Sequence, residues 1–563
     1  MDDHPDDRPD QPARPLRHLL REPVRRSAET VVEPIDRDSS RGCIIAPMTG
    51  MKRPLTVRLM AGVVCATGLC GAAMAAAPPE PGAGAPAAQT STSAQACGQL
   101  TSLKLPDIRI TDAVVVPAAT TGAVRAAHCR VDGIVGTEIR ITLLLPDQWN
   151  GKFFMGGGGG FVGSIQNSAQ TSVNDGYATV GTDTGHQGNG TDAGWALNNL
   201  ERQVNFGYLA VHRTAEAAKS IITGYYGRAA SRNYFSGCSR GGGQAFMEAQ
   251  RFPNDFDGII AGAPAFDWTG LAAQNVSNAQ AVFPDPRKLG TPMFTLDELK
   301  LVESKILDAC DASDGVKDGV IDDPRQCRFD VNTLPLSEAK KAALKKIYAS
   351  TKNGEGEIYP PQPFGGEGQL AGWPAWIAGG GPAGPNGPTL RFAFGTQIFK
   401  FLVFNDPDWD YSRYELSRWK QDTALAASYL NATNPDLSVF KAHGGKLILW
   451  HGWADAALTP LASIRYHEQV YTRDSGAADY FRTFMLPGVL HCAGGNGPDT
   501  VDWPSVLADW VEKGRAPDRV VAKKMVNGVP TRSRPLCPYP QKAVYSGSGS
   551  TDDEQNFVCR RPN

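Results

Sequence analysis

The chain has 563 residues, of which 41% are hydrophobic and 20% are charged, and its formal net charge is -2. This composition is typical of a globular protein, and the length allows a large core with a second domain or a big insertion. A net charge so close to zero gives no indication of a nucleic acid or an anionic membrane surface as a partner.

The N-terminal part differs from the rest. Residues 1–50 are rich in Asp, Arg and Pro without an apolar period, so we expect disorder or an incorrectly assigned start. Residues 51–77 begin with a basic segment and continue as an apolar run that ends in Ala-Met-Ala, which is typical of a signal peptide. We therefore expect translation to begin at Met51 or Met48, residues 78–96 to form a linker, and the mature protein to be secreted or periplasmic. A membrane anchor is the alternative, but the run is short for a span.

Cysteine usage agrees with export. Of 11 cysteines, Cys43, Cys65 and Cys70 lie in or before the expected signal peptide, which leaves eight. An even number in an exported chain predicts disulfide bonds, although counting alone does not determine the pairing. The eight are Cys97, Cys129, Cys238, Cys310, Cys327, Cys492, Cys537 and Cys559.

Short apolar segments alternate with helix-forming segments through much of the chain. This alternation favours an α/β fold with a mainly parallel sheet covered on both faces. The expected strands are 138–145, 152–155, 177–182, 233–236, 258–262, 446–450 and 480–486, and the expected helices include 208–225, 242–249 and 501–513.

The segment 265–440 interrupts this alternation. It is rich in Gly, Pro and Trp and contains local helices such as 296–309. Because structureless loops of this length are uncommon, we interpret the segment as an inserted lid domain. The core domain would then consist of residues 97–264 and 441–563.

Residues 237–241, Gly-Cys-Ser-Arg-Gly, lie between an expected strand and an expected helix. They match G-x-S-x-G, the nucleophile elbow of α/β-hydrolases. The sharp turn lifts the hydroxyl of Ser239 out of the sheet, and the glycines on both sides let the backbones approach. A glycine-rich turn with an incidental serine is the alternative, and partners for the serine would exclude it.

A serine nucleophile needs a base, and the base needs a carboxylate that orients it. In α/β-hydrolases the acid and then the histidine follow the serine in the chain. His491 lies directly after the last expected strand, and Asp455 is the carboxylate in the turn after the strand 446–450. Asp455 as a simple helix N-cap is the alternative. His451, close to Asp455 in sequence, would either shape the acid loop or face the substrate.

An acyl-transfer reaction also needs backbone donors for the oxyanion. The N–H of Arg240, directly after the nucleophile, is one expected donor, and the glycine-rich loop 156–160 after an early strand provides the other. These glycines lack the G-x-G-x-x-G spacing into a helix, so a dinucleotide loop is discounted.

From about Cys97 to Cys559 the chain resembles the tannase and feruloyl esterase family. The most specific sign is a cysteine beside each candidate catalytic residue, in Cys238-Ser239 and His491-Cys492. Further matching stretches are 149–155, 257–264 and 534–540. The resemblance implies an α/β-hydrolase core with a large inserted lid, and it places the oxyanion glycine on Gly160. It also implies the disulfides Cys238–Cys492, Cys310–Cys327 and Cys537–Cys559, which leaves Cys97 with Cys129.

The lid contains an acidic loop, residues 310–323, in which five aspartates follow Cys310. Like charges repel unless they are solvated or bridged by a cation, and hard oxygen ligands favour Ca²⁺. The spacing does not fit an EF-hand but resembles the calcium loop of this family. The resemblance implies a structural Ca²⁺ ion held by the side chains of Asp311, Asp314 and Asp318 and the carbonyls of Val316 and Val320. A solvated acidic turn is the alternative.

The expected protein is therefore a secreted serine esterase with Ser239, His491 and Asp455 as its triad. The resemblance implies small esters of aromatic acids as substrates, namely hydroxycinnamoyl, galloyl or terephthalate monoesters. No redox or organic cofactor, no nucleic acid and, in the mature form, no membrane is expected. A general carboxylesterase of other specificity and a non-catalytic exported binding protein on the same fold are the alternatives. The oligomeric state does not follow from the sequence.

Overall fold

Two sheets form the framework of the residues that the computed structural model describes, 96–379 and 387–561. One is a parallel sheet in the order β11-β10-β7-β6-β4, and the other is an antiparallel sheet in the order β1-β2-β3-β5. The parallel strands are β4 (Lys152–Gly156), β6 (Arg232–Cys238), β7 (Gly258–Gly262), β10 (Lys446–Gly452) and β11 (Phe481–Leu486). The antiparallel strands are β1 (Ile108–Val116), β2 (His128–Val135), β3 (Ile139–Pro146) and β5 (Thr179–Thr182).

The expectation of a mainly parallel sheet is right for the strands around the elbow and wrong for the segments 138–145 and 177–182. The second segment is β5, which pairs antiparallel with β3. The first is β3, which pairs antiparallel with β2 through a short turn at Gly136, where φ is 56°. A parallel pair needs a long crossover, so a connection this short permits only a hairpin. The two sheets meet where Phe154 N–H donates to the Ala178 carbonyl at 2.9 Å.

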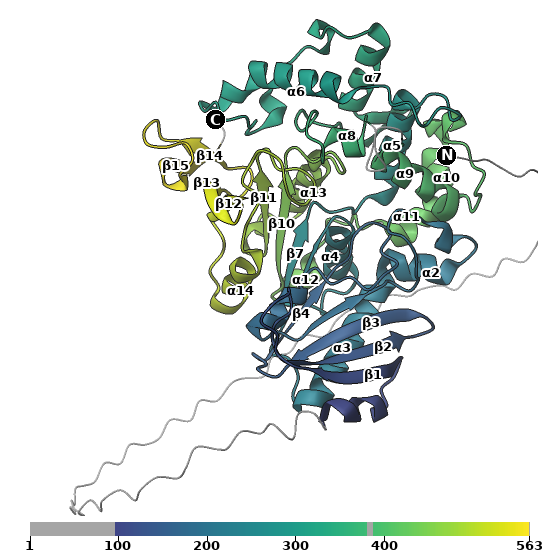
Figure 1. The fold of residues 1–563 in the computed structure, drawn as a ribbon, viewed down its shortest axis with the longest axis vertical. Helices are drawn as coiled ribbons and strands as arrows, with labels where there is room; N and C mark the ends of the chain where they lie inside the picture. The colour runs from purple at the N-terminus through teal and green to yellow at the C-terminus, as the bar shows by residue number, and fades with distance from the viewer. Residues whose placement is uncertain (1–95, 380–386, 562–563) are drawn as a thin grey trace, which may run out of the picture. The chain divides into compact units, whose positions relative to one another are not determined.

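Both faces of the parallel sheet are buried, which explains its continuous apolar sequences. Consecutive residues such as Phe153 and Phe154, or Ile259 and Ile260, belong to core clusters on opposite faces. The helices α3 (Ala210–Tyr226), α4 (Arg240–Arg251), α13 (Pro460–Arg473) and α14 (Trp503–Lys513) accompany the strands. In Figure 1, α14 and α4 lie beside the parallel strands.

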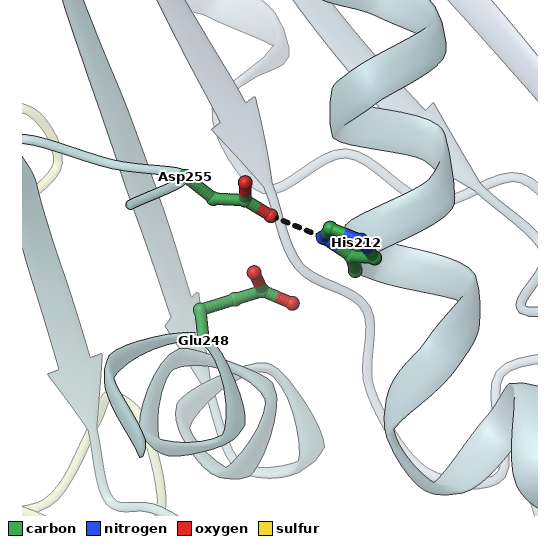
Figure 2. A group of neighbouring side chains, drawn as sticks. All are labelled: His212, Glu248 and Asp255. Atoms are coloured by element: carbon green, nitrogen blue, oxygen red, sulfur yellow. Dashed lines mark hydrogen bonds and ion pairs between the residues drawn. The ribbon is translucent and has the colours of Figure 1, made fainter. Parts of the chain in front are cut away.

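The helix α4 begins at the elbow and runs past α3. Glu248, near the C-terminal end of α4, faces His212 of α3 and Asp255 of the loop that follows α4 (Figure 2). The elbow helix is therefore placed by the sheet at one end and by α3 farther along.

The chain between β7 and β10 is mostly helical and gathers in the upper part of Figure 1. The expected helix 296–309 is α6. A capping box between Thr295 and Glu298 stabilises the start of this helix. The elements of this segment are α5 (Trp268–Val282), α6 (Leu296–Cys310), α7 (Glu338–Tyr348), β8 (Thr351–Asn353), β9 (Gly356–Tyr359), α8 (Trp373–Trp376), α9 (Leu390–Gln397), α10 (Trp419–Asp422), α11 (Ala424–Leu430) and α12 (Ser438–Ala442).

After α14 the chain forms two hairpins, β12 (Val520–Val526) with β13 (Val529–Leu536) and β14 (Lys542–Tyr545) with β15 (Phe557–Arg560). The structure contains the disulfides Cys97–Cys129, Cys238–Cys492, Cys310–Cys327 and Cys537–Cys559, and these are the pairs that the family resemblance implied.

The expected signal peptide at 51–77, the segment 1–50 before it and nearly all of the linker 78–96 lie outside the described residues. In the part of the chain that is described, no helix has the length and apolar character needed to cross a membrane.

Candidate active site

Ser239 occupies a sharp turn between β6 and α4. Its backbone has φ 62° and ψ -121°, a conformation that non-glycine residues rarely adopt and that is typical of a nucleophile elbow. The turn is held because the Ser239 N–H donates to the Gly262 carbonyl at 3.0 Å. A Cβ atom on Gly237 would lie 2.5 Å from the carbonyl carbon of Gly241, so the close approach of strand and helix requires glycine at this position.

His491 and Asp455 come together from loops that follow two neighbouring parallel strands, β11 and β10. Nδ1 of His491 lies 2.8 Å from Oδ2 of Asp455. The other carboxylate oxygen of Asp455 accepts hydrogen bonds from the backbone N–H groups of Ala457 at 2.7 Å and Leu458 at 2.9 Å. The acid is therefore anchored by its own loop and directed at the histidine.

The carboxylate of Asp455 is fully buried and yet remains ionised. Burial by itself raises the pKa of Asp455, but His491 and His451 lower it by more, to well below its ordinary value. A buried ionised acid beside an imidazole fixes the tautomer of the ring and stabilises the imidazolium form.

His451 contacts the same acid. Its Nε2 lies 3.1 Å from Oδ2 of Asp455, and its Nδ1 lies 2.8 Å from the hydroxyl of Ser463. The side chain is only 1% exposed. His451 lies on β10, its ring is turned into the protein between Asp455 and Ser463, and it is not among the residues that line the cavity beside Ser239.

The disulfide Cys238–Cys492 joins the residue before Ser239 to the residue after His491 across 254 residues of sequence. Ser239 and His491 both line one cavity, but the hydroxyl of Ser239 has no hydrogen-bond partner among the described residues. Catalytic hydrogen bonds are often long in the absence of substrate, so this geometry is compatible with a nucleophile and its base.

The glycine-rich loop after β4 approaches the elbow. The N–H groups of Gly157, Gly158 and Gly159 donate to oxygen atoms of the protein at 2.8 to 3.1 Å, whereas Gly160 N–H has no partner among the described residues. Gly160 has φ 57°, and a Cβ there would lie 2.3 Å from the Gly190 carbonyl oxygen. Gly160 and Arg240 line the same cavity as Ser239, which leaves their backbone donors available to an oxyanion.

The guanidinium of Arg240 is turned away from solvent. It lies 4.4 Å from the centre of the Phe206 ring and 5.4 Å from that of Trp268, and it donates to the carbonyls of Phe206 and Gly207. Burial lowers the pKa of Arg240 to about 9. The side chain of Arg240 therefore packs on aromatic rings, although the residue directly follows the nucleophile.

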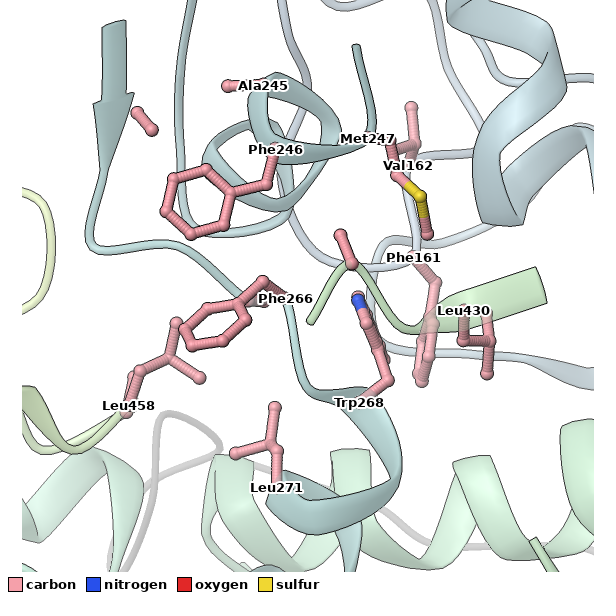
Figure 3. Packing of buried hydrophobic residues seen from close by; sticks show 14 of the residues in the cluster. Phe161, Val162, Ala245, Phe246, Met247, Phe266, Trp268, Leu271, Leu430 and Leu458 are labelled. Atoms are coloured by element: carbon pink, nitrogen blue, oxygen red, sulfur yellow. The ribbon is translucent and has the colours of Figure 1, made fainter. Parts of the chain in front are cut away.

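The cavity above Ser239 is small in this structure, with a volume of about 30 Å³, and it has a largely apolar lining. Trp268 and Leu271 of α5 contribute to it, and Figure 3 shows their packing beside Phe161 and Phe266. Trp376 stands edge-to-face with His491, with ring centres 5.0 Å apart. The full lining is Gly160, Ser239, Arg240, Ala265, Trp268, Leu271, Asn275, Trp376, Phe394, Ala457, Leu458 and His491.

Sequence reasoning did not single out Trp268 or Trp376. Trp268 follows β7 closely, and ligands of open α/β sheets bind beyond the carboxyl ends of the strands, so its position was a usable signal. Trp376 lies in a Gly-, Pro- and Trp-rich part of the inserted segment, and nothing in its local sequence distinguishes it from a core tryptophan such as Trp373.

The acidic loop does not contribute to the lining of this cavity. Asp311 accepts backbone hydrogen bonds from Asp318, Gly319 and Val320 at 3.1 to 3.3 Å, and Asp318 pairs with Arg534 at 2.5 Å. Burial raises the pKa of both Asp314 and Asp318. The charge of Asp318 raises the pKa of Asp314 further, whereas Arg534 and Arg532 partly offset the rise at Asp318.

A further carboxylate of the acidic loop, Asp322, has its pKa raised to about 7 by burial and by the charge of Asp314. Its Oδ2 is buried and has no hydrogen-bond partner among the described residues. The carboxylate oxygens of the acidic loop are ligands that suit a hard cation. They do not all lie within 4.8 Å of one another, whereas the ligand atoms of His212, Glu248 and Asp255 do.

Comparisons with known proteins agree with this geometry. The family described as tannase and feruloyl esterase matches residues 123–560. The chain is 32% identical over 524 residues to mono(2-hydroxyethyl) terephthalate hydrolase of Piscinibacter sakaiensis, which covers 79% of this chain and 87% of that protein. It is 35% identical over 540 residues to an uncharacterized esterase of Xanthomonas campestris, which covers 84% of this chain and 92% of that protein.

Among solved structures, feruloyl esterase B from Aspergillus oryzae superimposes with a TM-score of 0.74 at 26% identity, covering 83% of this chain and 100% of that chain. The chain therefore belongs to the tannase and feruloyl esterase family and is a carboxylic ester hydrolase with an α/β-hydrolase fold.

Proposed function

We propose that this chain is a secreted serine esterase for esters of aromatic acids, with Ser239, His491 and Asp455 as its triad. The observation that carries the proposal is that a strained strand-to-helix turn places Ser239 in one cavity with His491, whose Nδ1 is held 2.8 Å from the buried Asp455.

The reaction follows from these positions. Ser239 Oγ attacks the ester carbonyl while Nε2 of His491 takes its proton, and Asp455 stabilises the imidazolium that forms. The N–H groups of Gly160 and Arg240 hold the oxyanion of the tetrahedral intermediate. The alcohol leaves with the proton from His491, and water, activated by the same base, then releases the acid and restores Ser239.

The lining of the cavity supports an aromatic acyl group. Trp268, Trp376 and Phe394 present rings close to Ser239 and His491, and aromatic pairs add attraction beyond the burial of apolar area. One similar protein is a mono(2-hydroxyethyl) terephthalate hydrolase, and several others are probable feruloyl esterases. A hydroxycinnamoyl, galloyl or terephthalate monoester is accordingly the proposed substrate.

The decisive assay measures acid release from methyl ferulate, methyl gallate and mono(2-hydroxyethyl) terephthalate, with Ser239→Ala as the blank. Turnover of any one ester that Ser239→Ala abolishes supports the proposal and names the acyl preference. Hydrolysis of short aliphatic esters alone would indicate a general carboxylesterase. A folded protein that neither turns over esters nor reacts with a fluorophosphonate at Ser239 would be a binding protein.

A second variant tests whether the aromatic side chains of the cavity bind the acyl group of the substrate. Trp376→Ala is expected to raise KM for an aromatic acyl ester about tenfold while KM for an acetyl ester with the same alcohol changes little, since one aromatic contact is worth about 0.5–1.5 kcal/mol. Phe404→Ala, in the same segment but outside the cavity lining, is the matched control. Equal effects of Trp376→Ala on the two esters would place the acyl group elsewhere.

We also propose that the acidic loop holds a structural Ca²⁺ ion. The side chains of Asp311, Asp314 and Asp318 and the carbonyls of Val316 and Val320 would supply its ligands, and the ion would neutralise carboxylates whose pKa values burial raises. The disulfide Cys310–Cys327 closes the loop at both ends, which supports a preformed site.

A further inference from the structure

A second group of ionisable side chains meets where α3 and α4 pass each other. His212 comes from α3, Glu248 from α4 and Asp255 from the loop after α4, and Figure 2 shows all three directed at a common point. Nδ1 of His212 lies 2.6 Å from Oδ2 of Asp255, and the three residues offer ligand atoms that all lie within 4.8 Å of one another.

Glu248 is the unusual member of this group. Its side chain is 0% exposed, and no donor among the described residues reaches either of its carboxylate oxygens, because the group that it meets is the carboxylate of Asp255. Burial, and then the neighbouring Asp255, raise the pKa of Glu248 well above its ordinary value. A buried carboxylate without partners is costly, so a proton or a cation must neutralise it.

Lys219, the positively charged side chain beside this group, does not pair with both carboxylates. Lys219 lies 3.2 Å from Asp255 and 3.0 Å from Glu216, and no ion pair joins it to Glu248 in the described part of the chain. If Asp255 turned toward another cation, Lys219 would keep Glu216 as its partner. A divalent ion could therefore bind the two carboxylates while Lys219 keeps an ion-pair partner.

We propose that His212, Glu248 and Asp255 form a binding site for a first-row divalent transition metal such as Zn²⁺. An imidazole with two carboxylates suits zinc, whereas Ca²⁺ prefers oxygen ligands alone. Tetrahedral zinc ligands lie about 3.3 Å apart, so the present side chains need only small rotations to surround an ion. The His212 side chain is 28% exposed, so the cluster lies near the surface on the side of α3.

The ion would act on the fold and not on the reaction. Glu248 follows Ser239 by nine residues, which corresponds to about 13 Å along the helix. By joining α3 to α4 and the loop after it, the metal would fasten the helix that begins at the nucleophile.

The test uses the full chain, dialysed against ZnCl₂ and then against metal-free buffer, with zinc measured by mass spectrometry and Tm by calorimetry. Glu248→Gln keeps the shape and removes the carboxylate, and His212→Asn removes the imidazole at the partly exposed edge. Glu367→Gln, the same substitution at a fully buried glutamate outside the cluster, is the matched control. The chain is expected to retain about one more equivalent of zinc than either cluster variant, and zinc is expected to raise its Tm but not theirs.

The control should retain zinc like the unaltered chain, and ester turnover should be unchanged in Glu248→Gln. Equal zinc retention in the chain and in Glu248→Gln would overturn the proposal. So would a Glu248→Gln variant that is as stable as the unaltered chain with and without zinc, since that result would mean that a proton shared with Asp255 neutralises Glu248.

Discussion

The carboxylate of Asp455 and those of the acidic loop are both withdrawn from solvent, but their surroundings differ. Asp455 receives two backbone N–H donors and faces His491 and His451, and its pKa is held well below the ordinary value. In the acidic loop, Asp314 and Asp318 are partly buried, and their pKa values are raised although Arg532 and Arg534 pair with Asp318. The pKa of an aspartate is therefore lowered by histidines and hydrogen-bond donors in one region and raised by burial in the other.

The largest expected effect comes from removing the charge of Asp455. Asp455→Asn should lower kcat roughly a thousand- to ten-thousand-fold, because His491 loses the partner that fixes its tautomer and stabilises its charged form. The measurement is kcat for the preferred ester, with Asp267→Asn, another buried acid that does not touch His491, as the control. A loss below tenfold would mean that another group orients the base.

Removal of calcium should have the next largest effect, and it should act on stability. A chelator is expected to lower the free energy of unfolding by about 3 kcal/mol when the ion had been present at a hundred times its Kd. Asp311→Asn should start near the destabilised level and should not respond further to the chelator. An unaltered chain that is as stable with chelator as with Ca²⁺ would show that Arg532 and Arg534 suffice to balance the acidic loop.

A third carboxylate sharpens the comparison through pH. Asp267 caps α5, accepting from Gly270 N–H at 3.0 Å, and burial raises its pKa from 3.8 to about 6. Between these values the folded chain holds a proton that the unfolded chain has lost, so this carboxylate makes stability fall as the pH rises from about 4 to 6. Asp455 has the opposite sign, because its lowered pKa adds stability above about pH 4 that is lost on acidification.

Urea unfolding from pH 3 to 8 checks both signs. Asp267→Asn keeps a capping side chain and should gain about 2 kcal/mol relative to the unaltered chain between pH 4 and pH 7. Asp455→Asn should instead lose its disadvantage as the pH falls below 4. Parallel curves for all three proteins would show that neither carboxylate titrates differently in the folded and unfolded states.

Much of the candidate site could be predicted from the sequence because its residues follow strands that are recognisable locally. Ser239 lies in a short motif between an apolar strand and a helix, and Asp455 and His491 each follow a buried strand in the expected order. The strands themselves were recognisable because both faces of the sheet are buried, which makes their sequences apolar throughout. The antiparallel pairing of β3 was missed because β2, the strand that precedes it across a short turn, was not among the expected strands.

The sequence by itself thus determined the strands of the parallel sheet, the elbow and the identity of the three residues proposed to react. Only the tertiary structure turned His451 onto Asp455, brought Trp376 against His491 and brought Glu248 up to His212 and Asp255. For the last two contacts the physical reason is distance along the chain. A motif records how neighbouring residues bend the backbone, whereas contacts between segments far apart in sequence arise only when the helices pack on the sheet.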